Sequence, residues 1–73
     1  RVNAILPGTT RTPMIEGFIN GDPNIEKMVS RGIGRGYLGE PAEIAEAAVW
    51  LCSDRASFVS GASLSVDGST VNR

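Results

Sequence analysis

The stretch PAEIAEAAVWLCS, residues 41–53, carries the strongest helix signal in the chain and decides its fold class. Pro41 suits the first position of a helix, because its ring fixes φ and its missing N–H needs no partner there. Glu43 and Glu46 lie in the N-terminal half, where the helix dipole favours negative charge. At about 100° per residue, the apolar side chains cover about 200° of the helix surface. These are Ile44, Ala45, Ala47, Ala48, Val49, Leu51 and Cys52. We therefore expect a helix buried on more than one side, with Cys52 as a small buried apolar residue.

Two apolar segments flank this helix and have the composition of strands. Residues 2–6 contain Val and Ile and end at Pro7-Gly8, which is typical of a turn. Residues 58–66 lead into an alternation of apolar residues with serines, and Asp67-Gly68 ends it as a turn. Two strands separated by a helix indicate a parallel pair, so the sequence predicts an α/β fold. The expected segments are residues 1–8 as strand and turn, 41–53 as helix and 58–68 as last strand.

Residues 9–39 form a long excursion between the first strand and the helix. The spacing of Met14, Ile15, Phe18 and Ile19 predicts one short amphipathic helix, and residues 24–31 after Pro23 predict a second. Connections of this length usually carry function. Because glycines are frequent in residues 20–37, we expect this part to be the least ordered and to show the fastest hydrogen exchange.

Length and composition exclude several classes of protein. The chain has 73 residues, a net charge of −1, one cysteine and no histidine. A single cysteine forms no internal disulfide, and without histidine the usual zinc ligand sets cannot be assembled. The charge balance argues against nucleic-acid binding, and no apolar run is long enough to span a membrane. A core of this size needs a partner or the rest of a larger protein, and the start at Arg1 without an initiator Met favours the latter.

The segment GRGYLG, residues 34–39, matches the pattern G-x-G-x-x-G of dinucleotide-binding loops. That function requires a strand before the first glycine, and the preceding residues 24–31 have the composition of a helix. Glu40 would also place a carboxylate where phosphates should lie. We therefore interpret residues 34–39 as a flexible glycine loop.

Residues 7–13, PGTTRTP, follow the first strand and offer three hydroxyl groups, free backbone groups and a glycine that permits close approach. Ligands of open α/β sheets bind just beyond the carboxyl ends of strands. The residues alone leave two alternatives, a polar contact site or a threonine-rich turn without a ligand. We find no catalytic constellation among the titratable residues.

Five ordered motifs together resemble the C-terminal part of the short-chain dehydrogenases/reductases: RVNAILPG (1–8), TPM (12–14), GEPAEIA (39–45), WLCSD (50–54) and SGASLSVDG (60–68). The resemblance implies a cytoplasmic NAD(P)-dependent oxidoreductase acting on an alcohol or carbonyl, with a Rossmann-like, doubly wound parallel sheet. The chain would supply the sixth strand, the substrate loop over residues 9–39, the last long helix and the seventh strand.

The resemblance also assigns roles to individual residues. Pro7 and Gly8 would shape the turn that holds the nicotinamide, the backbone of Thr10 would meet its carboxamide, and Thr12 would bond that amide or the phosphates. Thr10 departs from the family pattern, which usually has Val or Ile there, although a backbone contact would survive the change. The mobile substrate lid would be lined by Met14, Ile15 and Phe18.

The catalytic Ser and Tyr-x-x-x-Lys of this family and its glycine-rich phosphate loop would all lie upstream of Arg1. Tyr37 and Lys27 occur in the wrong order to replace the catalytic pair. We therefore expect this chain to contribute no catalytic residue and no metal site, and to bind neither NAD nor NADP by itself. The alternative function is a truncated, non-catalytic fragment that associates with copies of itself.

Trp50 falls on the polar side of the predicted helix. A large apolar side chain gives no burial there if that side faces only water. Trp is enriched among interface anchors, and members of this family commonly assemble through the last helix and the last strand. We therefore expect a homo-oligomer formed through residues 41–53, including Trp50, and the strand over residues 62–66.

Overall fold

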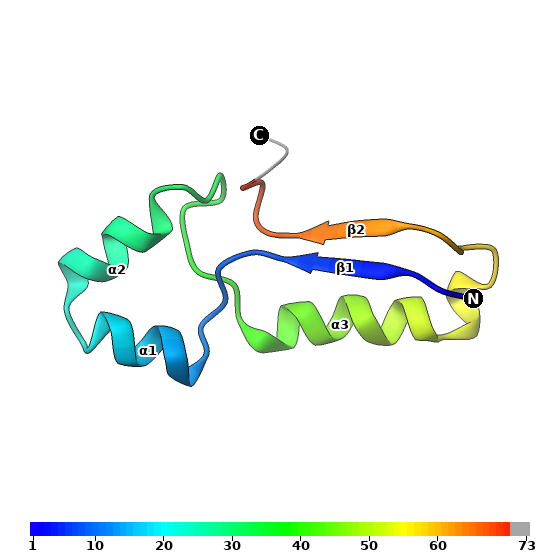
Figure 1. Cartoon of the computed structure of the whole chain (residues 1–73), viewed down its shortest axis with the longest axis horizontal. Helices are drawn as coiled ribbons and strands as arrows, with labels where there is room; N and C mark the ends of the chain where they lie inside the picture. Colours follow the sequence, from blue (N-terminus) through cyan, green and yellow to red (C-terminus); the bar gives the residue numbers. More distant parts are fainter. Residues whose placement is uncertain (71–73) are drawn as a thin grey trace.

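The computed structural model describes residues 1–70. Two strands, β1 (Ala4–Pro7) and β2 (Ser63–Val66), pair in parallel, with Ala4 opposite Ser63 and Pro7 opposite Val66. The helix α3 (Pro41–Cys52) packs along both strands (Figure 1). The short helices α1 (Pro13–Ile19) and α2 (Pro23–Ser30) extend beyond the carboxyl ends of the strands (Figure 1). The predicted α/β class, the parallel pair and the two short helices are confirmed.

Each of the three α-helices begins with proline at its first position and an N-cap residue before it. The Thr12 hydroxyl accepts the N–H of Ile15 at 3.4 Å, and the Asp22 carboxylate accepts the N–H of Asn24 at 2.9 Å. At the start of α3, the N–H of Glu40 donates to Oε1 of Glu43 at 2.9 Å. These local bonds satisfy N–H groups that a helix leaves unpaired, and they help to fix where each helix begins.

The last strand is shorter than predicted, because residues 58–62 form a turn before β2 begins at Ser63. Gly61 has a φ of 77°, which glycine adopts without steric cost. The Asn3 side chain accepts the N–H of Ala62 at 2.9 Å and donates to the carbonyl of Val59 at 3.1 Å. Since a side chain takes these bonds, the segment cannot form a regular ladder with β1.

The first residue of the chain is fixed to the end of α3. The Arg1 guanidinium donates to the carbonyl oxygens of Leu51 and Val59 at 2.9 Å and of Ser53 at 3.1 Å. The carbonyls at the end of a helix lack intrahelical partners, and a cation there also complements the helix dipole. Arg1 therefore joins the end of α3 to the turn before β2.

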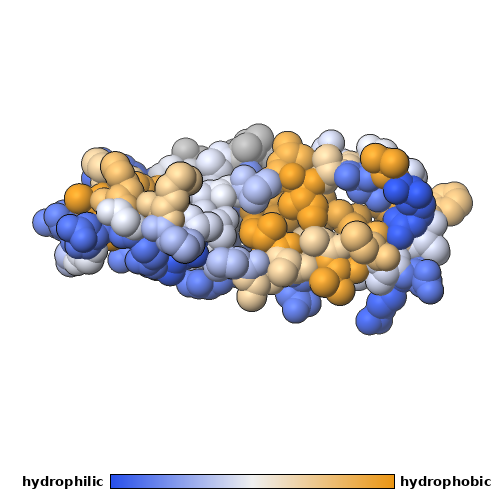
Figure 2. All heavy atoms as spheres, turned by 60° about the horizontal axis from the view of Figure 1, so that its bottom comes forward, coloured by the Kyte–Doolittle hydropathy of each residue, from blue (hydrophilic) through white to orange (hydrophobic). Residues whose placement is uncertain are grey.

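The prediction that α3 is buried on more than one side is wrong for this chain. Only Leu51 of α3 is buried, at 6% exposure, whereas Val49 is 67% exposed and Cys52 is exposed. The cause is that, among the helices and strands of residues 1–70, α3 contacts only the two strands and the 3-10 turn Asp54–Ala56, so its outer side is uncovered. Figure 2 shows the resulting apolar area around α3 and the strands. A second small cluster, Ile19, Ile33 and Leu38, lies under α1 and α2.

Candidate functional site

The candidate site is an open pocket of about 520 Å³ at the carboxyl end of β1. It is lined by Pro7, Gly8, Thr9, Thr10, Thr12, Met14, Ile15 and Thr70. The structure thus brings together four predicted cofactor contacts and two of three predicted lid residues. Phe18 does not line this pocket and is 58% exposed on α1. Sequence reasoning missed Thr70, although the parallel pair places the end of β2 beside the end of β1.

The backbone of Thr10 is held by a single parallel bridge to Gly39. The N–H of Gly39 donates to the carbonyl of Thr9 at 3.0 Å, and the N–H of Arg11 donates to the carbonyl of Gly39 at 2.7 Å. In such a bridge the middle residue keeps its own N–H for the other side. Among residues 1–70, the Thr10 N–H has no hydrogen-bond partner. Its hydroxyl donates back to the carbonyl of Gly8 at 2.9 Å, which stiffens the turn.

Thr12 lines the pocket and is also the N-cap of α1, because its hydroxyl accepts the N–H of Ile15. The cap uses one lone pair of the oxygen, so the O–H keeps its hydrogen for a further acceptor. Thr12 can therefore cap α1 and bond a ligand with the same side chain.

Between these two threonines, Arg11 binds three carboxylates from three parts of the fold. Its guanidinium bonds Glu16 on α1 at 2.9 Å and Glu26 on α2, and its Nε lies 3.5 Å from Glu40 at the start of α3. The hydrogen bond to Glu26, followed by that to Glu16, raises the pKa of Arg11 above its ordinary value. Sequence reasoning missed Arg11, because no local spacing predicts which distant carboxylates meet it.

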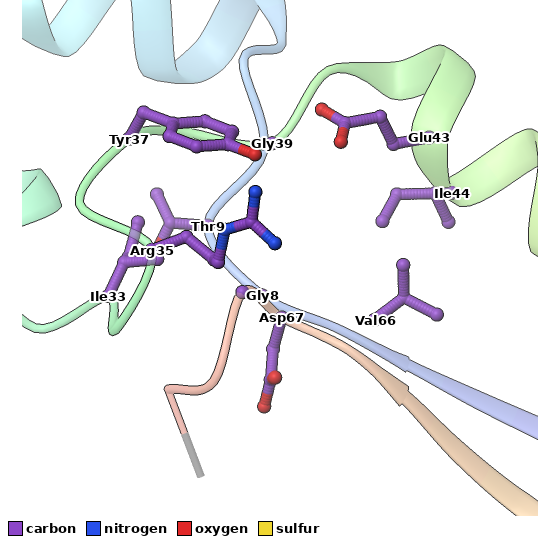
Figure 3. A pocket seen from close by; sticks show the side chains of 11 residues that line it. Gly8, Thr9, Ile33, Arg35, Tyr37, Gly39, Glu43, Ile44, Val66 and Asp67 are labelled. Carbon is purple, nitrogen blue, oxygen red and sulfur yellow. The ribbon is translucent and has the colours of Figure 1, made fainter. Parts of the chain in front are cut away.

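The turn at Gly8 packs closely against the end of β2. A Cβ on Gly8 would lie 2.7 Å from the Cα of Asp67, so only glycine lets the end of β1 approach β2 this closely. Beside this contact lies a second pocket of about 130 Å³ (Figure 3), in which Ile44 of α3 and Val66 of β2 face each other. Its far wall holds Arg35, whose guanidinium stacks 5.7 Å from the centre of the Tyr37 ring. Asp67 forms the predicted turn, accepting the N–H of Ser69 at 3.0 Å.

The segment 34–39 is a loop that follows α2, as the sequence predicts, and the element directly before it is this helix and not a strand. A Cβ on Gly34 would lie 2.7 Å from the Cβ of Ser69, and Gly36 has a φ of 83°. These glycines therefore allow the loop to turn and to pack against the segment after β2.

Two further kinds of function lack support in the described residues. Within residues 1–70, no group of three or more His, Cys, Asp or Glu side chains is placed to hold a metal ion. None of the helices in this range is long and apolar enough to cross a membrane.

Comparison with known proteins identifies relatives along nearly the whole chain. The family model described as enoyl-(acyl carrier protein) reductase matches residues 1–69. The chain is 53% identical over 68 residues to the A-factor type γ-butyrolactone 1'-reductase of Streptomyces virginiae, covering 93% of this chain and 26% of that protein.

Solved structures agree with this result. One described as a short-chain dehydrogenase/reductase family protein has a TM-score of 0.76 at 40% identity, over 93% of this chain and 26% of that chain. Another, from Agrobacterium tumefaciens, is assigned as a 2-deoxy-d-gluconate 3-dehydrogenase with bound NADP. It has a TM-score of 0.84 at 38% identity, over 100% of this chain and 29% of that chain. The chain therefore spans about a quarter of the length of these relatives.

Proposed function

The chain belongs to the short-chain dehydrogenase/reductase family, and from this premise we propose that it forms the C-terminal part of an NAD(P)-dependent oxidoreductase. The proposed substrate is an alcohol or carbonyl compound, and the proposed location is the cytoplasm. Hydride transfer would use catalytic groups from the part of the enzyme outside this chain. This chain would contribute the nicotinamide turn, the lid and a subunit interface.

The observation that carries the proposal is the N–H of Thr10, which has no hydrogen-bond partner among the described residues and belongs to a residue lining the open pocket at the end of β1. A backbone donor beside a second donor, the Thr12 hydroxyl, suits the oxygen of a carboxamide. Gly8 contributes by its position, because its lack of a side chain lets the turn lie directly against Asp67 at the end of β2. These groups fit a nicotinamide, which when bound supplies or accepts the hydride.

The lid side of the pocket favours an uncharged substrate. Met14 and Ile15 line it from α1, and Met14 is 78% exposed, so an apolar ligand would cover surface that otherwise faces water. Among residues 1–70, none of the side chains lining this pocket carries a charge. The Streptomyces relative is named a γ-butyrolactone 1'-reductase, and a neutral compound that carries a lactone ring would suit such a wall. Phe18 would join the lid when it closes.

Two substitutions of Thr10 test the cofactor role in the intact protein. Thr10→Pro removes the N–H, and we expect the KM for NAD(P) to rise about tenfold, the value of one hydrogen bond of about 1.4 kcal/mol. Thr10→Val keeps the N–H and should leave this KM nearly unchanged. Circular dichroism spectra would confirm that both variants fold. Equal cofactor constants for the two variants would contradict the proposed contact.

The subunit interface is proposed along residues 41–53 of α3 and residues 62–66 around β2. Trp50 is 45% exposed, and Val49 extends the same uncovered apolar surface. Trp50→Ala should weaken self-association by about 2 kcal/mol, within the range of interface hot spots, as measured by sedimentation. Phe58→Ala, which removes an exposed aromatic side chain outside both segments, is the matched control.

The same uncovered surface supports the alternative function, a non-catalytic fragment that associates with its own copies. The intact mass of the native protein and its turnover of NAD(P) separate the two functions. A product of only 73 residues that self-associates and has no turnover would support the fragment and contradict the enzyme.

A further inference from the structure

Arg11 is the point at which the two lid helices and the start of α3 are joined. Its guanidinium bonds Glu16 of α1 and Glu26 of α2, and it lies within ion-pair distance of Glu40, the residue before α3. Its backbone N–H bonds the carbonyl of Gly39 at 2.7 Å. The Arg11 side chain therefore connects α1, α2 and the start of α3. Its backbone N–H also forms part of the bridge between the proposed cofactor turn and Gly39.

The charges at this point make Arg11 difficult to replace. Three carboxylates converge on one guanidinium, so its removal would leave three like charges close together and without their common partner. Each pair is partly exposed, and a single exposed ion pair contributes little. Exposed ion pairs contribute more to stability when several of them form a network, as they do here around one planar guanidinium with several donors.

The lid has few other attachments that could compensate. No residue of α2 is buried, and α1 buries only Ile19. The apolar cluster of Ile19, Ile33 and Leu38 connects the helices to the following loop. Ile15, Ile25 and Val29 pack against this cluster. Its contact with the turn is made through Ile15, which also lines the pocket beside Thr10 and Thr12, whereas Arg11 lies between these two threonines and bonds both helices directly.

We propose that Arg11 is a positioning residue that docks α1 and α2 as one unit on the nicotinamide turn. It thereby keeps the lid side chains Met14 and Ile15 opposite Thr10 and Thr12. The inference rests on the proposed function for its effect on the cofactor site, whereas the docking itself needs no cofactor. Arg11 touches neither cofactor nor substrate in this role, and it acts through the backbone on either side of it.

Hydrogen exchange of residues 13–30 in the intact protein tests the docking directly. Arg11→Gln should accelerate exchange there about tenfold at low ionic strength, because several weak pairs are lost together. In the unmodified protein, salt at about 0.5 M should accelerate the same amides, since screening weakens exposed ion pairs. In Arg11→Gln this salt effect should disappear. Arg11→Lys keeps the charge without the planar fork and should give an intermediate rate.

Two further variants separate this role from a general loss of stability. Arg31→Gln removes the same charge from the end of α2, and the Arg31 guanidinium makes no ion pair within residues 1–70. It should leave exchange unchanged. Adding Glu26→Gln to Arg11→Gln relieves repulsion between the remaining carboxylates and should restore part of the protection.

Steady-state kinetics test the positioning. Arg11→Gln should raise the KM for NAD(P) several-fold with a smaller change in kcat, and Arg11→Lys should recover most of this loss. Unchanged exchange in Arg11→Gln, equal exchange in Arg31→Gln, or a faster lid with an unaltered KM would each overturn the proposal. Failure of the proposed function is distinguishable, because it would appear as absent NAD(P) turnover in the unmodified protein.

Discussion

The body of the chain (β1, α3 and β2) and the lid (α1 and α2) are stabilised by different interactions. The body has a parallel ladder, and the side chains of Arg1 and Asn3 bond backbone groups more than 45 residues away. The lid depends on one small apolar cluster and on the partly exposed ion pairs of Arg11. Such local interactions open at a lower free energy than a strand ladder. We therefore expect that the lid can move without breaking the sheet, as closure over a bound cofactor in the proposed function would require.

The largest expected effect comes from removing a buried side chain of the body. Leu51 is the buried residue of α3, and Leu51→Ala should lower the free energy of unfolding by about 3 kcal/mol through lost burial and a cavity. Ile19→Ala, the equivalent change in the lid, should mainly accelerate exchange of residues 13–30. Urea unfolding and hydrogen exchange of the intact protein measure both effects. Equal shifts of the urea midpoint would show that body and lid unfold as one unit.

A smaller effect is expected where the two regions meet, at Gly8. In Gly8→Ala the new Cβ would lie 2.7 Å from the Cα of Asp67, a backbone atom that cannot turn away. We expect a loss of about 2 kcal/mol, typical of overpacking, together with weaker cofactor binding. Gly32→Ala is the control, because nothing lies within 4 Å of a Cβ there and its φ is not positive. A stable Gly8→Ala variant would contradict the close approach of β1 to β2.

The helices and the parallel pair could be predicted because their signals are local. Pro23 and Pro41 mark two helix starts, the apolar spacing after Pro13 indicates the first short helix, and a helix between two strands implies parallel pairing. The exposure of Cys52, for which the apolar pattern indicates burial, could not be predicted in the same way. It depends on what covers α3, and a periodic apolar pattern does not say whether a covering element is present.

The remaining differences arise from side chains that act over long distances. Asn3 shortens the last strand by bonding residues near 60, and the sequence of that segment contains no sign of this contact. Arg11 is similar, since its partners become neighbours only after the fold has formed. Within the candidate site, the turn over residues 7–12 could be placed, because ligand sites follow strand ends. The places of Thr70 and Arg11 in the site became evident only from the folded structure.

A further prediction concerns the Asn3 contact in the body. Asn3→Ala removes two hydrogen bonds to the turn before β2 and leaves the N–H of Ala62 without that acceptor. The expected loss is about 1 kcal/mol in the free energy of unfolding, with faster exchange at residues 59–62. Asn24→Ala in α2 is the control, because among residues 1–70 its side chain makes no hydrogen bond. Similar losses in the two variants would indicate that this side-chain bridge contributes nothing.

The smallest effect tests the comparison most directly, because it should strengthen the lid alone. Gly17 lies inside α1, and a Cβ there would meet nothing within 4 Å. Gly17→Ala should stabilise the helix by about 0.5–1 kcal/mol, since alanine loses less backbone entropy than glycine. If the lid opens independently, exchange at residues 13–19 should slow about two- to five-fold, corresponding to that free energy. Residues 44–52 should keep their rates, which we expect to be slower than those of residues 20–37 in every variant. Equal slowing at residues 44–52 would mean that lid and body open together, and the difference in their contacts would then have no dynamic consequence.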